Sequence, residues 1–333
     1  MKTLITGATG FIGRHLVKAL HEKERPIKCL VRKTSQTSFL EQLGVELVYG
    51  DLADMGSLRK ALSETDIIYH AAGEVFALEA KNYYTVNVAG VKNLLKACSN
   101  GSVKKFIHFS SSAVTGPNPV RNIPVNEDSP CCPITPYGKS KLEGEKLVKE
   151  FSKQYNVPTI IIRPTIVIGP WVSQSSRVLM FLKSIHKGVF RILGSGNNLI
   201  SLCHIDNLIH GLLLAEKEQR AEGQTYFFAD AQPYTINEIA ETIAKEEGKQ
   251  LPIPHMPFWA ANILSMGLSL SSRLFGFTSP LTRNTVNELK NNWFVDIKKA
   301  QSQLGYQPIV ELKDGVKKTV EWFINEYLAK HSN

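Results

Sequence analysis

A strand followed directly by a glycine-rich turn is the feature that most constrains the fold of this chain. Residues 2–7 form an apolar run, and the letters TGATGFIG at its end place a glycine at every third position before a helical segment. Glycines allow the tight turn and let backbone N–H groups at the helix N-terminus approach a pyrophosphate. The spacing is GxxGxxG rather than the general GxGxxG fingerprint, and a glycine triplet also fits a plain strand–helix turn. Its place after an apolar strand favours a nucleotide cofactor, whose contacts we assign to Gly7, Gly10, Phe11, Ile12 and Gly13.

Strands and helices alternate along the whole first half of the chain. Several of the expected strands are nearly continuous apolar runs, as is typical of strands that helices cover on both faces. We predict strands at 2–7, 27–32, 45–50, 66–73, 104–112 and 158–169, and helices at 12–22, 55–63, 82–98 and 137–154. This pattern predicts an α/β protein with a Rossmann-type doubly wound parallel sheet. We expect a nucleotide-binding domain over 1–170, with 200–218 packing back on it, and a smaller substrate-binding region over 171–199 and 219–333.

Composition excludes several classes of protein. With 333 residues, 43% of them hydrophobic, the chain can bury a substantial core and is neither disordered nor fibrous. Its net charge of +9 is dispersed and lacks interleaved aromatic platforms, so we expect no nucleic-acid partner. The five cysteines include no CxxC pair, which indicates neither a metal site nor a disulfide framework. The chain enters a strand at once, leaving no room for a signal peptide, and we expect a cytoplasmic protein.

The end of the second strand bears on the choice between NAD and NADP. An acidic residue there binds the ribose hydroxyl of NAD and repels a 2′-phosphate, whereas an arginine accommodates that phosphate. The letters CLVRKTS carry Arg32 and Lys33 and no acid. Because a guanidinium forms bidentate, charge-assisted pairs with phosphate, we predict NADP(H) in preference to NAD(H). Arg14 is a weaker second candidate for the phosphate, and a plain exposed loop arginine is the alternative interpretation of Arg32.

The third and fourth strands end in further candidate cofactor contacts. Asp51 and Leu52, in YGDLAD, are placed to lie against an adenine, with the carboxylate accepting the proton of its exocyclic amine. Small residues are needed where a cofactor passes close to the backbone, and HAAG provides Ala71, Ala72 and Gly73. Together these positions mark the carboxyl ends of successive strands, where ligands bind in such sheets.

The stretch TPYGKSKLEGEK indicates proton transfer. When a cofactor carries the hydride, the protein has to supply a proton donor and acceptor and a polarising hydrogen bond. A tyrosine, with an ordinary pKa of about 10, fits this role if a lysine cation stabilises its phenolate. On a helix the i+4 residue shares the tyrosine's face and the i+2 residue does not, so Lys141 qualifies as the partner of Tyr137 and Lys139 does not. The three serines of FIHFSSSAVTGP supply hydroxyl donors, and which of them acts, or whether they only cap the next segment, stays open.

In their order and spacing these motifs resemble the extended short-chain dehydrogenase/reductase superfamily. The resemblance rests on TGATGFIG, GDL, HAAG, NVAGV, SSSAVTGP, YGKSK and RPTIVIGP and covers most of residues 1–215. The catalytic residues that it implies are Ser111, Tyr137, Lys141 and Asn87, the last in a supporting role. It further implies that Lys141 lowers the pKa of Tyr137 and holds the ribose, and that Pro164 and Thr165 lie near the nicotinamide.

Three observations favour the branch that is similar to 3β-hydroxysteroid dehydrogenases and dihydroflavonol reductases. Arg32 in place of an acid favours NADP(H), which suits net reduction. The segment NNLISLCHIDNL has no basic residue before His204, where sugar-nucleotide enzymes commonly carry an arginine for the substrate diphosphate. The stretch 250–272 contains no Asp, Glu, Lys or Arg and provides apolar side chains for a substrate wall. We expect a ketone and a secondary alcohol to be interconverted on a mostly apolar small molecule, such as a steroid, a flavonoid or a β-keto acid.

Alternatives stay open for both the activity and the apolar stretch. A nucleotide-sugar epimerase or dehydratase with tightly bound NAD has the same fold, and a non-catalytic NADP-binding regulator is the alternative from another class. The apolar stretch also fits a buried core helix or, over 257–275, a helix in a membrane interface, and a full membrane span ranks last. The resemblance also implies a homodimer through the helices 82–98 and 137–154.

Overall fold

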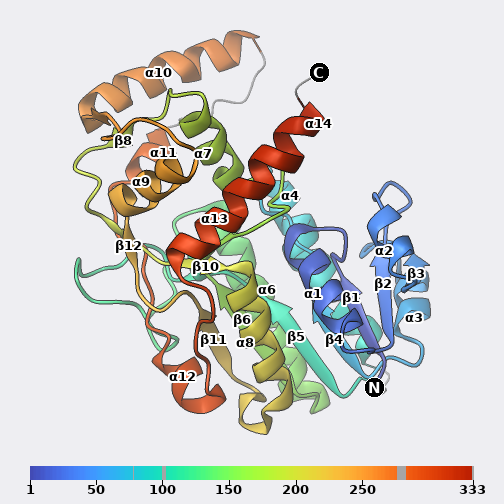
Figure 1. Ribbon diagram of the computed structural model, residues 1–333. Coiled ribbons are helices and arrows are strands. Elements are labelled where there is room, and N and C mark those ends of the chain that lie inside the picture. The colour runs from blue at the N-terminus through green and yellow to red at the C-terminus, as the bar shows by residue number, and fades with distance from the viewer. Residues whose placement is uncertain (78, 100–102, 276–282, 332–333) are drawn as a thin grey trace.

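A seven-stranded parallel sheet with helices on both faces forms the centre of the molecule (Figure 1). The computed structural model describes residues 1–77, 79–99, 103–275 and 283–331. The strands lie in the order β11-β6-β5-β4-β1-β2-β3, and all neighbours are parallel. Their bounds are β1 Thr3–Thr6, β2 Ile27–Val31, β3 Glu46–Tyr49, β4 Ile67–His70, β5 Lys105–Phe109, β6 Thr159–Pro164 and β11 Thr225–Phe228. The predicted Rossmann-type architecture is therefore confirmed, and its switch point, where ligands bind, lies between β1 and β4.

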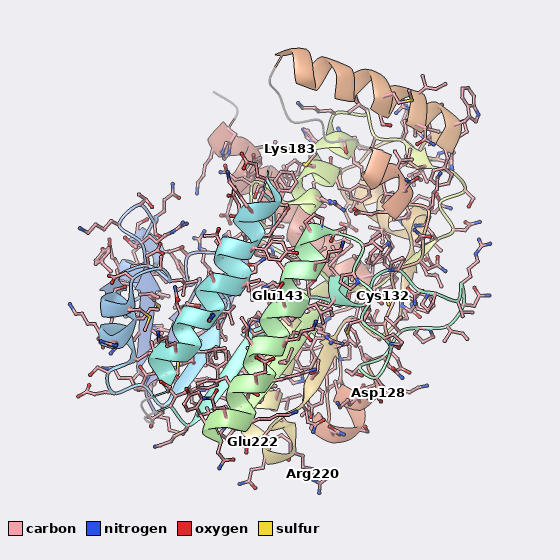
Figure 2. All side chains as sticks on the ribbon, turned by 180° about the vertical axis from the view of Figure 1, so that it is seen from behind. Asp128, Cys132, Glu143, Lys183, Arg220 and Glu222 are labelled. Atoms are coloured by element: carbon pink, nitrogen blue, oxygen red, sulfur yellow. The ribbon has the colours of Figure 1, made fainter. Side chains whose placement is uncertain are left out.

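Two helical layers bury the two faces of this sheet. One layer contains α1 (Phe11–His21), α2 (Ser38–Gln42), α8 (Ile205–Lys217) and α12 (Lys298–Leu304). The other contains α3 (Met55–Leu62), α5 (Val91–Cys98) and α6 (Pro136–Tyr155). Figure 2 looks onto the second layer, where α5 and α6 lie side by side. Leu16 of α1 and Leu94 of α5 are fully buried, one under each layer, so both strand faces are apolar as the sequence pattern requires.

One expected strand and one expected domain boundary differ from what the structure contains. The run 158–169 is not one strand: β6 ends at Pro164, and β7 (Ile166–Ile168) pairs instead with β10 (Leu202–His204). Thr165 interrupts the run, since its backbone N–H bonds the carbonyl of Phe228. We expected 219–333 to lie in the substrate-binding region, yet β11 within it is the edge strand of the sheet beside β6. The sheet therefore draws on both parts of the chain.

The expected helix 82–98 is three consecutive segments. It begins as α4 (Ala80–Tyr84), continues as the π-helical segment η1 (Thr85–Gly90) and ends as α5. Segments of π-helix are rare and occur frequently at functional sites, because they change which side chains share a face. The change here carries Asn87 to a buried position.

The C-terminal part of the chain has a core of its own above the sheet (Figure 1). Its apolar cluster joins residues of α7, α9 and α13, such as Leu179, Ile239 and Val316. The remaining elements are η2 (Ser112–Val114), α7 (Arg177–His186), β8 (Ile192–Leu193), β9 (Leu199–Ile200), η3 (Gln219–Ala221), β12 (Tyr234–Thr235), α9 (Ile236–Glu246), β13 (His255–Met256), α10 (Phe258–Phe275), α11 (Arg283–Glu288), α13 (Leu312–Trp322), η4 (Phe323–Leu328) and α14 (Ala329–His331).

Helix α10 lies on the outside of this C-terminal part (Figure 1). Ala261 and Ser265 are fully buried on its inner side. On its outer side Trp259, Ile263 and Met266 are 69%, 63% and 65% exposed, so the interpretation of this stretch as an ordinary buried helix is wrong for that face. Across the part of the chain that the structure describes, no helix has the length and apolar character needed to span a bilayer.

Candidate active site

The first two turns of α6 present the tyrosine and the lysine of the expected acid–base pair. Thr135 caps the helix by accepting a hydrogen bond from the backbone N–H of Gly138 at 3.0 Å, and Pro136 occupies the first helical position. Tyr137 follows in the first turn, and Lys141 lies one turn later, almost completely buried. Lys139 is exposed on another face of the helix. The spacing that separated the two lysines in the sequence thus also separates them in space.

One of the three serines after β5 reaches this tyrosine. The hydroxyl of Ser111 lies near enough to Tyr137 to lower its pKa, and the same Oγ accepts from the backbone N–H of Ala113 at 3.2 Å and so caps η2. Ser112 begins η2, and Ser110 is buried with an Oγ that has no partner among the described residues. The structure therefore brings Ser111 to Tyr137 and leaves Ser110 buried. The cap and the hydroxyl donor, treated as alternatives from the sequence, are both provided by Ser111.

Burial dominates the electrostatics of this pair. It raises the pKa of Tyr137 to about 12, against the opposing effect of the nearby Ser111 hydroxyl. It also lowers the pKa of Lys141 to about 8, against the opposing effect of the Glu145 carboxylate. The Nζ of Lys141 donates a hydrogen bond to the carbonyl oxygen of Phe109 at 2.7 Å. The expected lowering of the Tyr137 pKa by Lys141 is thus not found, since burial dominates and the lysine ammonium is hydrogen-bonded to the backbone.

The side chain of Asn87, in η1, links the segment after β4 to helix α6 by hydrogen bonds. Its side chain donates to the carbonyl of Glu74 at 2.9 Å and to the hydroxyl of Ser140 at 3.0 Å, and it accepts from the backbone N–H of Glu74 at 2.8 Å. A Cβ added to Gly73 would lie 3.1 Å from the Lys141 Nζ and 3.2 Å from the Asn87 Oδ1. Asn87 and Lys141 therefore converge on the end of β4, and a side chain at position 73 would be in tight contact with both.

The glycine turn has the geometry of a pyrophosphate site. Gly7 has a φ of +74°, and a Cβ there would lie 2.5 Å from the backbone nitrogen of Ala72. A Cβ on Gly13 would overlap the carbonyl oxygen of Gly7. Helix α1 begins after Gly10 with no side-chain cap and no acid in its first turn, so its N–H groups and dipole are available to an anion. Phe11 and Ile12 are partly buried at the start of this helix. The chain here fits the diphosphate of a dinucleotide.

The other expected cofactor contacts lie around this turn. Arg32 and Lys33 follow β2 with exposed side chains, and Asp51 is exposed after β3, where its carboxylate accepts from the backbone N–H of Ala53 at 2.8 Å. Leu52 packs towards Gly90 of η1. Ala71 and Ala72 are partly buried beside the glycine turn, with backbone N–H groups that donate to the carbonyl and the hydroxyl of Thr6. Pro164 and Thr165 are buried where β6 ends.

A buried ion pair beneath Lys141 was not anticipated. Arg163 of β6 donates to Glu145 of α6 through Nε at 2.8 Å and Nη2 at 2.7 Å, and the two side chains are 2% and 1% exposed. Glu145 is one turn beyond Lys141 and two beyond Tyr137, so the i+4 spacing along one helix face was the available signal. Tyr83 was also missed: its ring lies 5.9 Å from that of Tyr137, and nothing in the sequence marked it.

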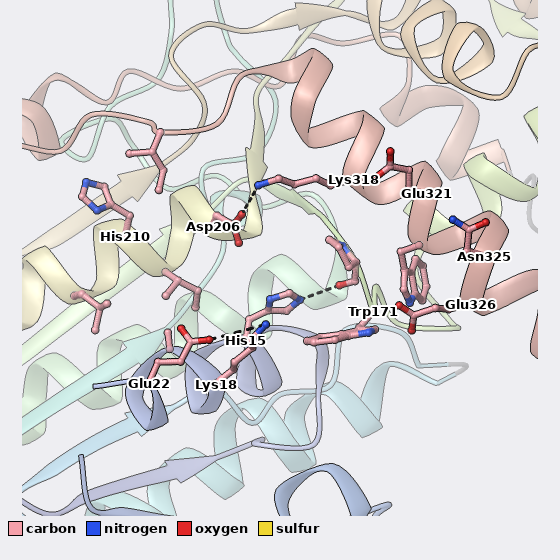
Figure 3. A pocket seen from close by; sticks show the side chains of 16 residues that line it. His15, Lys18, Glu22, Trp171, Asp206, His210, Lys318, Glu321, Asn325 and Glu326 are labelled. Carbon is pink, nitrogen blue, oxygen red and sulfur yellow. Dashed lines mark hydrogen bonds and ion pairs between the residues drawn. The ribbon is translucent and has the colours of Figure 1, made fainter. Parts of the chain in front are cut away.

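A large cavity lies elsewhere on the molecule. It has a volume of about 670 Å³ and opens between α1, α8, α13 and η4 (Figure 3). Its polar lining is already paired in part, since Lys318 contacts Asp206 at 3.0 Å and His15 bonds the carbonyl of Pro170 at 2.9 Å. None of the expected catalytic residues lines it. We therefore place the active site at the Tyr137 end of α6 and not in this cavity.

Comparison with known proteins identifies the family to which this arrangement belongs. The model of the NAD dependent epimerase/dehydratase family matches residues 3–228, which run from β1 to the end of β11. The chain belongs to this family. It is accordingly an NAD(P)-dependent enzyme of the short-chain dehydrogenase/reductase type, as the motifs indicated.

Relatives within the family differ in activity. UDP-glucose 4-epimerase of Vibrio cholerae is 30% identical over 96% of this chain and 95% of its own length. The 4-hydroxy-2-methyl-3-oxo-4-farnesyl-3,4-dihydroquinoline-1-oxide ketoreductase of Stigmatella aurantiaca is 27% identical over 95% of both chains. The crystal structure of UDP-glucuronic acid 4-epimerase from Bacillus cereus, in complex with NAD, superposes with a TM-score of 0.79 at 25% identity, covering 98% of this chain and 100% of that one. Epimerases and a ketoreductase thus share the family's fold.

Proposed function

We propose that this family member is an NADP(H)-dependent oxidoreductase that interconverts a ketone and a secondary alcohol on a mostly apolar small molecule. The observation that carries the proposal is the placement of Ser111 beside Tyr137 at the end of the sheet, with Lys141 buried one turn behind. The cofactor part is supported by the basic residues Arg32 and Lys33, which stand after β2 where an NAD enzyme carries an acid.

Each residue of the pair has a distinct task in this reaction. A bound nicotinamide supplies hydride in one direction and accepts it in the other. Ser111 and Tyr137 hydrogen-bond the substrate oxygen, and Tyr137 donates the proton that this oxygen needs when it gains charge. With a pKa of about 8, Lys141 is mostly a cation at pH 7 and stabilises the phenolate that remains. Asn87 and Gly73 leave the lysine only a narrow space and so fix its position.

Two observations support an apolar substrate. The segment 197–203 before His204 has no basic residue for a substrate diphosphate. The name of the Stigmatella relative describes a ketoreductase of a farnesyl-bearing quinoline oxide, which is a ketone on a largely apolar molecule. By analogy, the substrate class proposed here is a ketone or secondary alcohol on an apolar ring system.

A nucleotide-sugar epimerase is the second candidate, favoured by the 30% identity to the Vibrio enzyme. Such an enzyme returns its cofactor to the starting oxidation state in each cycle. Mass spectrometry of the cofactor released from the purified protein, with a spectrophotometric assay of NADPH consumption, distinguishes the two. Tightly bound NAD together with no net cofactor consumption on apolar ketones favours the epimerase.

The catalytic assignment is tested by Tyr137→Phe, with Tyr155→Phe at the exposed end of the same helix as the matched control. Loss of the proton donor is expected to lower kcat by roughly 10²- to 10⁴-fold with cofactor affinity retained, and the control is expected to keep full activity. A Tyr137→Phe enzyme within about tenfold of the unaltered kcat would show that another group moves the proton.

A further inference from the structure

Arg14 is a half-buried cation beside the glycine turn. It lies in the first turn of α1, directly after Gly13, and its guanidinium carbon lies 4.8 Å from the ring centre of Phe39 and 5.1 Å from that of Trp171. Its side-chain nitrogens have no hydrogen-bond partner in the described part of the chain, and Nε is buried. The carboxylate of Glu326 favours the charged form of Arg14 but accepts no hydrogen bond from it. Burial of a cation whose donors are unsatisfied is costly, so this position suits a further anion that can accept them.

The backbone and a hydrogen bond hold Trp171 in place beside Arg14. Trp171 has a φ of +64°, a conformation that is strained for a bulky residue and that clusters at functional sites. The neighbouring carbonyl of Pro170 is bonded to the His15 ring at 2.9 Å, which ties this loop to α1. Both rings contact the guanidinium from the same side, since their centres lie only 5.8 Å apart, and its N–H groups donate no hydrogen bond to another described residue.

A small hollow opens beside that guanidinium. Its volume is about 70 Å³, and we call it the Arg14 hollow. It is lined by Thr9, Arg14, Gln36, Ser38, Phe39 and Leu40. Thr9 belongs to the glycine turn, Gln36 to the segment between β2 and α2, and Ser38 to the start of α2, so the hollow joins the pyrophosphate end of the site to the side of the ribose. Its size and its hydroxyl and amide donors suit one phosphate group.

We propose that Arg14 binds the 2′-phosphate of NADP(H) in the Arg14 hollow. This rests on the proposed function, and it makes Arg14 the principal phosphate ligand where the sequence pattern favoured Arg32. The side chain of Arg32 is exposed, so its attraction to the phosphate is screened by solvent. Arg14 is half-buried against two aromatic rings and donates no hydrogen bond to another described residue, so its charge-assisted bonds to a phosphate are the stronger ones.

The test is calorimetric titration of the whole chain with adenosine 2′,5′-bisphosphate and with 5′-AMP, which differ only by the 2′-phosphate. Arg14→Met is expected to weaken bisphosphate binding by roughly 10- to 100-fold and to change 5′-AMP binding by less than about twofold. Lys18→Met is the matched control, because it removes the same charge from the next turn of α1, 5.8 Å from the same Trp171 ring and outside the hollow. The control is expected to change neither affinity.

Three outcomes decide against the proposal. Unchanged bisphosphate affinity in Arg14→Met, or an equal loss for both ligands, overturns the assignment of Arg14 while leaving the proposed function intact. Equal affinity of the unaltered chain for the two ligands instead refutes the NADP(H) preference itself. If Arg14→Met fails to fold, as judged by its melting curve, Arg14→Lys replaces it. That variant keeps the charge but not the planar fork of the guanidinium. Its affinity for the bisphosphate is expected to fall about tenfold while its affinity for 5′-AMP stays unchanged. The proposal is refuted if the two affinities change equally or not at all.

Discussion

The burial of Lys141 gives a sharp test of the site's electrostatics through the substitution Lys141→Met. The lysine is 5% exposed, and burial moves its pKa from an ordinary value of 10.5 to about 8. At pH 7 both the folded and the unfolded chain carry this proton, so the folded state bears the full cost of a buried charge. Between about pH 8 and 10.5 the unfolded chain binds a proton that the folded chain has released, so stability rises with pH. Methionine has no proton to release, and its variant lacks this rise.

The magnitude follows from the two pKa values. Integrating the proton difference from pH 7 to pH 10 gives about 2.5 kcal/mol of free energy of unfolding that the lysine enzyme gains and the methionine variant does not. The substitution also removes the hydrogen bond to the carbonyl of Phe109, which costs about 1–3 kcal/mol at every pH. The buried charge is therefore measured by how the difference in free energy of unfolding between the two proteins changes with pH, and not by the difference at any one pH.

The assay is urea unfolding of both proteins at several pH values between 7 and 10. Lys139→Met is the matched control, since Lys139 is exposed two residues away on the same helix. The free energy of unfolding of Lys141→Met relative to the unaltered enzyme is expected to fall by about 2.5 kcal/mol across this range, and that of the control to stay level. A flat difference for Lys141→Met would falsify the inference that the lysine is charged and desolvated at neutral pH.

Two further substitutions probe features around this site. Glu145→Gln is expected to lower the free energy of unfolding by about 3–5 kcal/mol, because Arg163 keeps its buried charge without a partner. The control is Glu143→Gln, at an exposed residue labelled in Figure 2, and its free energy of unfolding is expected to change by no more than about 0.5 kcal/mol. Similar urea midpoints for the two variants would contradict the reasoning. Gly13→Ala is expected to abolish fluorescence-detected NADPH binding, because its Cβ overlaps the backbone of the glycine turn. Gly267→Ala, with open space around the added methyl, is expected to bind normally, and NADPH binding by Gly13→Ala would refute the close packing.

Periodicity along the chain predicted the parts of the structure that depend on one element at a time. The i+4 rule separated Lys141 from Lys139 because a single helix determines which face each residue occupies. The apolar strands likewise predicted a doubly covered sheet. Features that need two distant elements escaped: the pair of Arg163 and Glu145 joins β6 to α6, and nothing local distinguishes such a strand arginine from an exposed one.

The predicted strand 158–169 was too long for the same reason, because its end depends on distant elements. An apolar run from 158 to 169 is a good strand pattern throughout, and only the tertiary partner of each half divides it, with β11 beside β6 and β10 beside β7. Choice among the three serines after β5 also needed the structure, because it depends on where α6 places Tyr137. For α10 the sequence shows an apolar, charge-free stretch, but hydropathy alone does not say which apolar face a fold leaves outside.

The position of β11 at the edge of the sheet also sets an order of events while the chain is being synthesised. Six neighbouring strands are complete once residue 164 has left the ribosome, yet the partner of β6 begins only at Thr225. Until then the outer N–H and C=O groups of β6 form an open edge, which is the kind of template on which nascent chains pair with one another. The edge of β6 therefore stays unpaired while the sixty residues between the two strands are synthesised, and it is covered when β11 pairs with it.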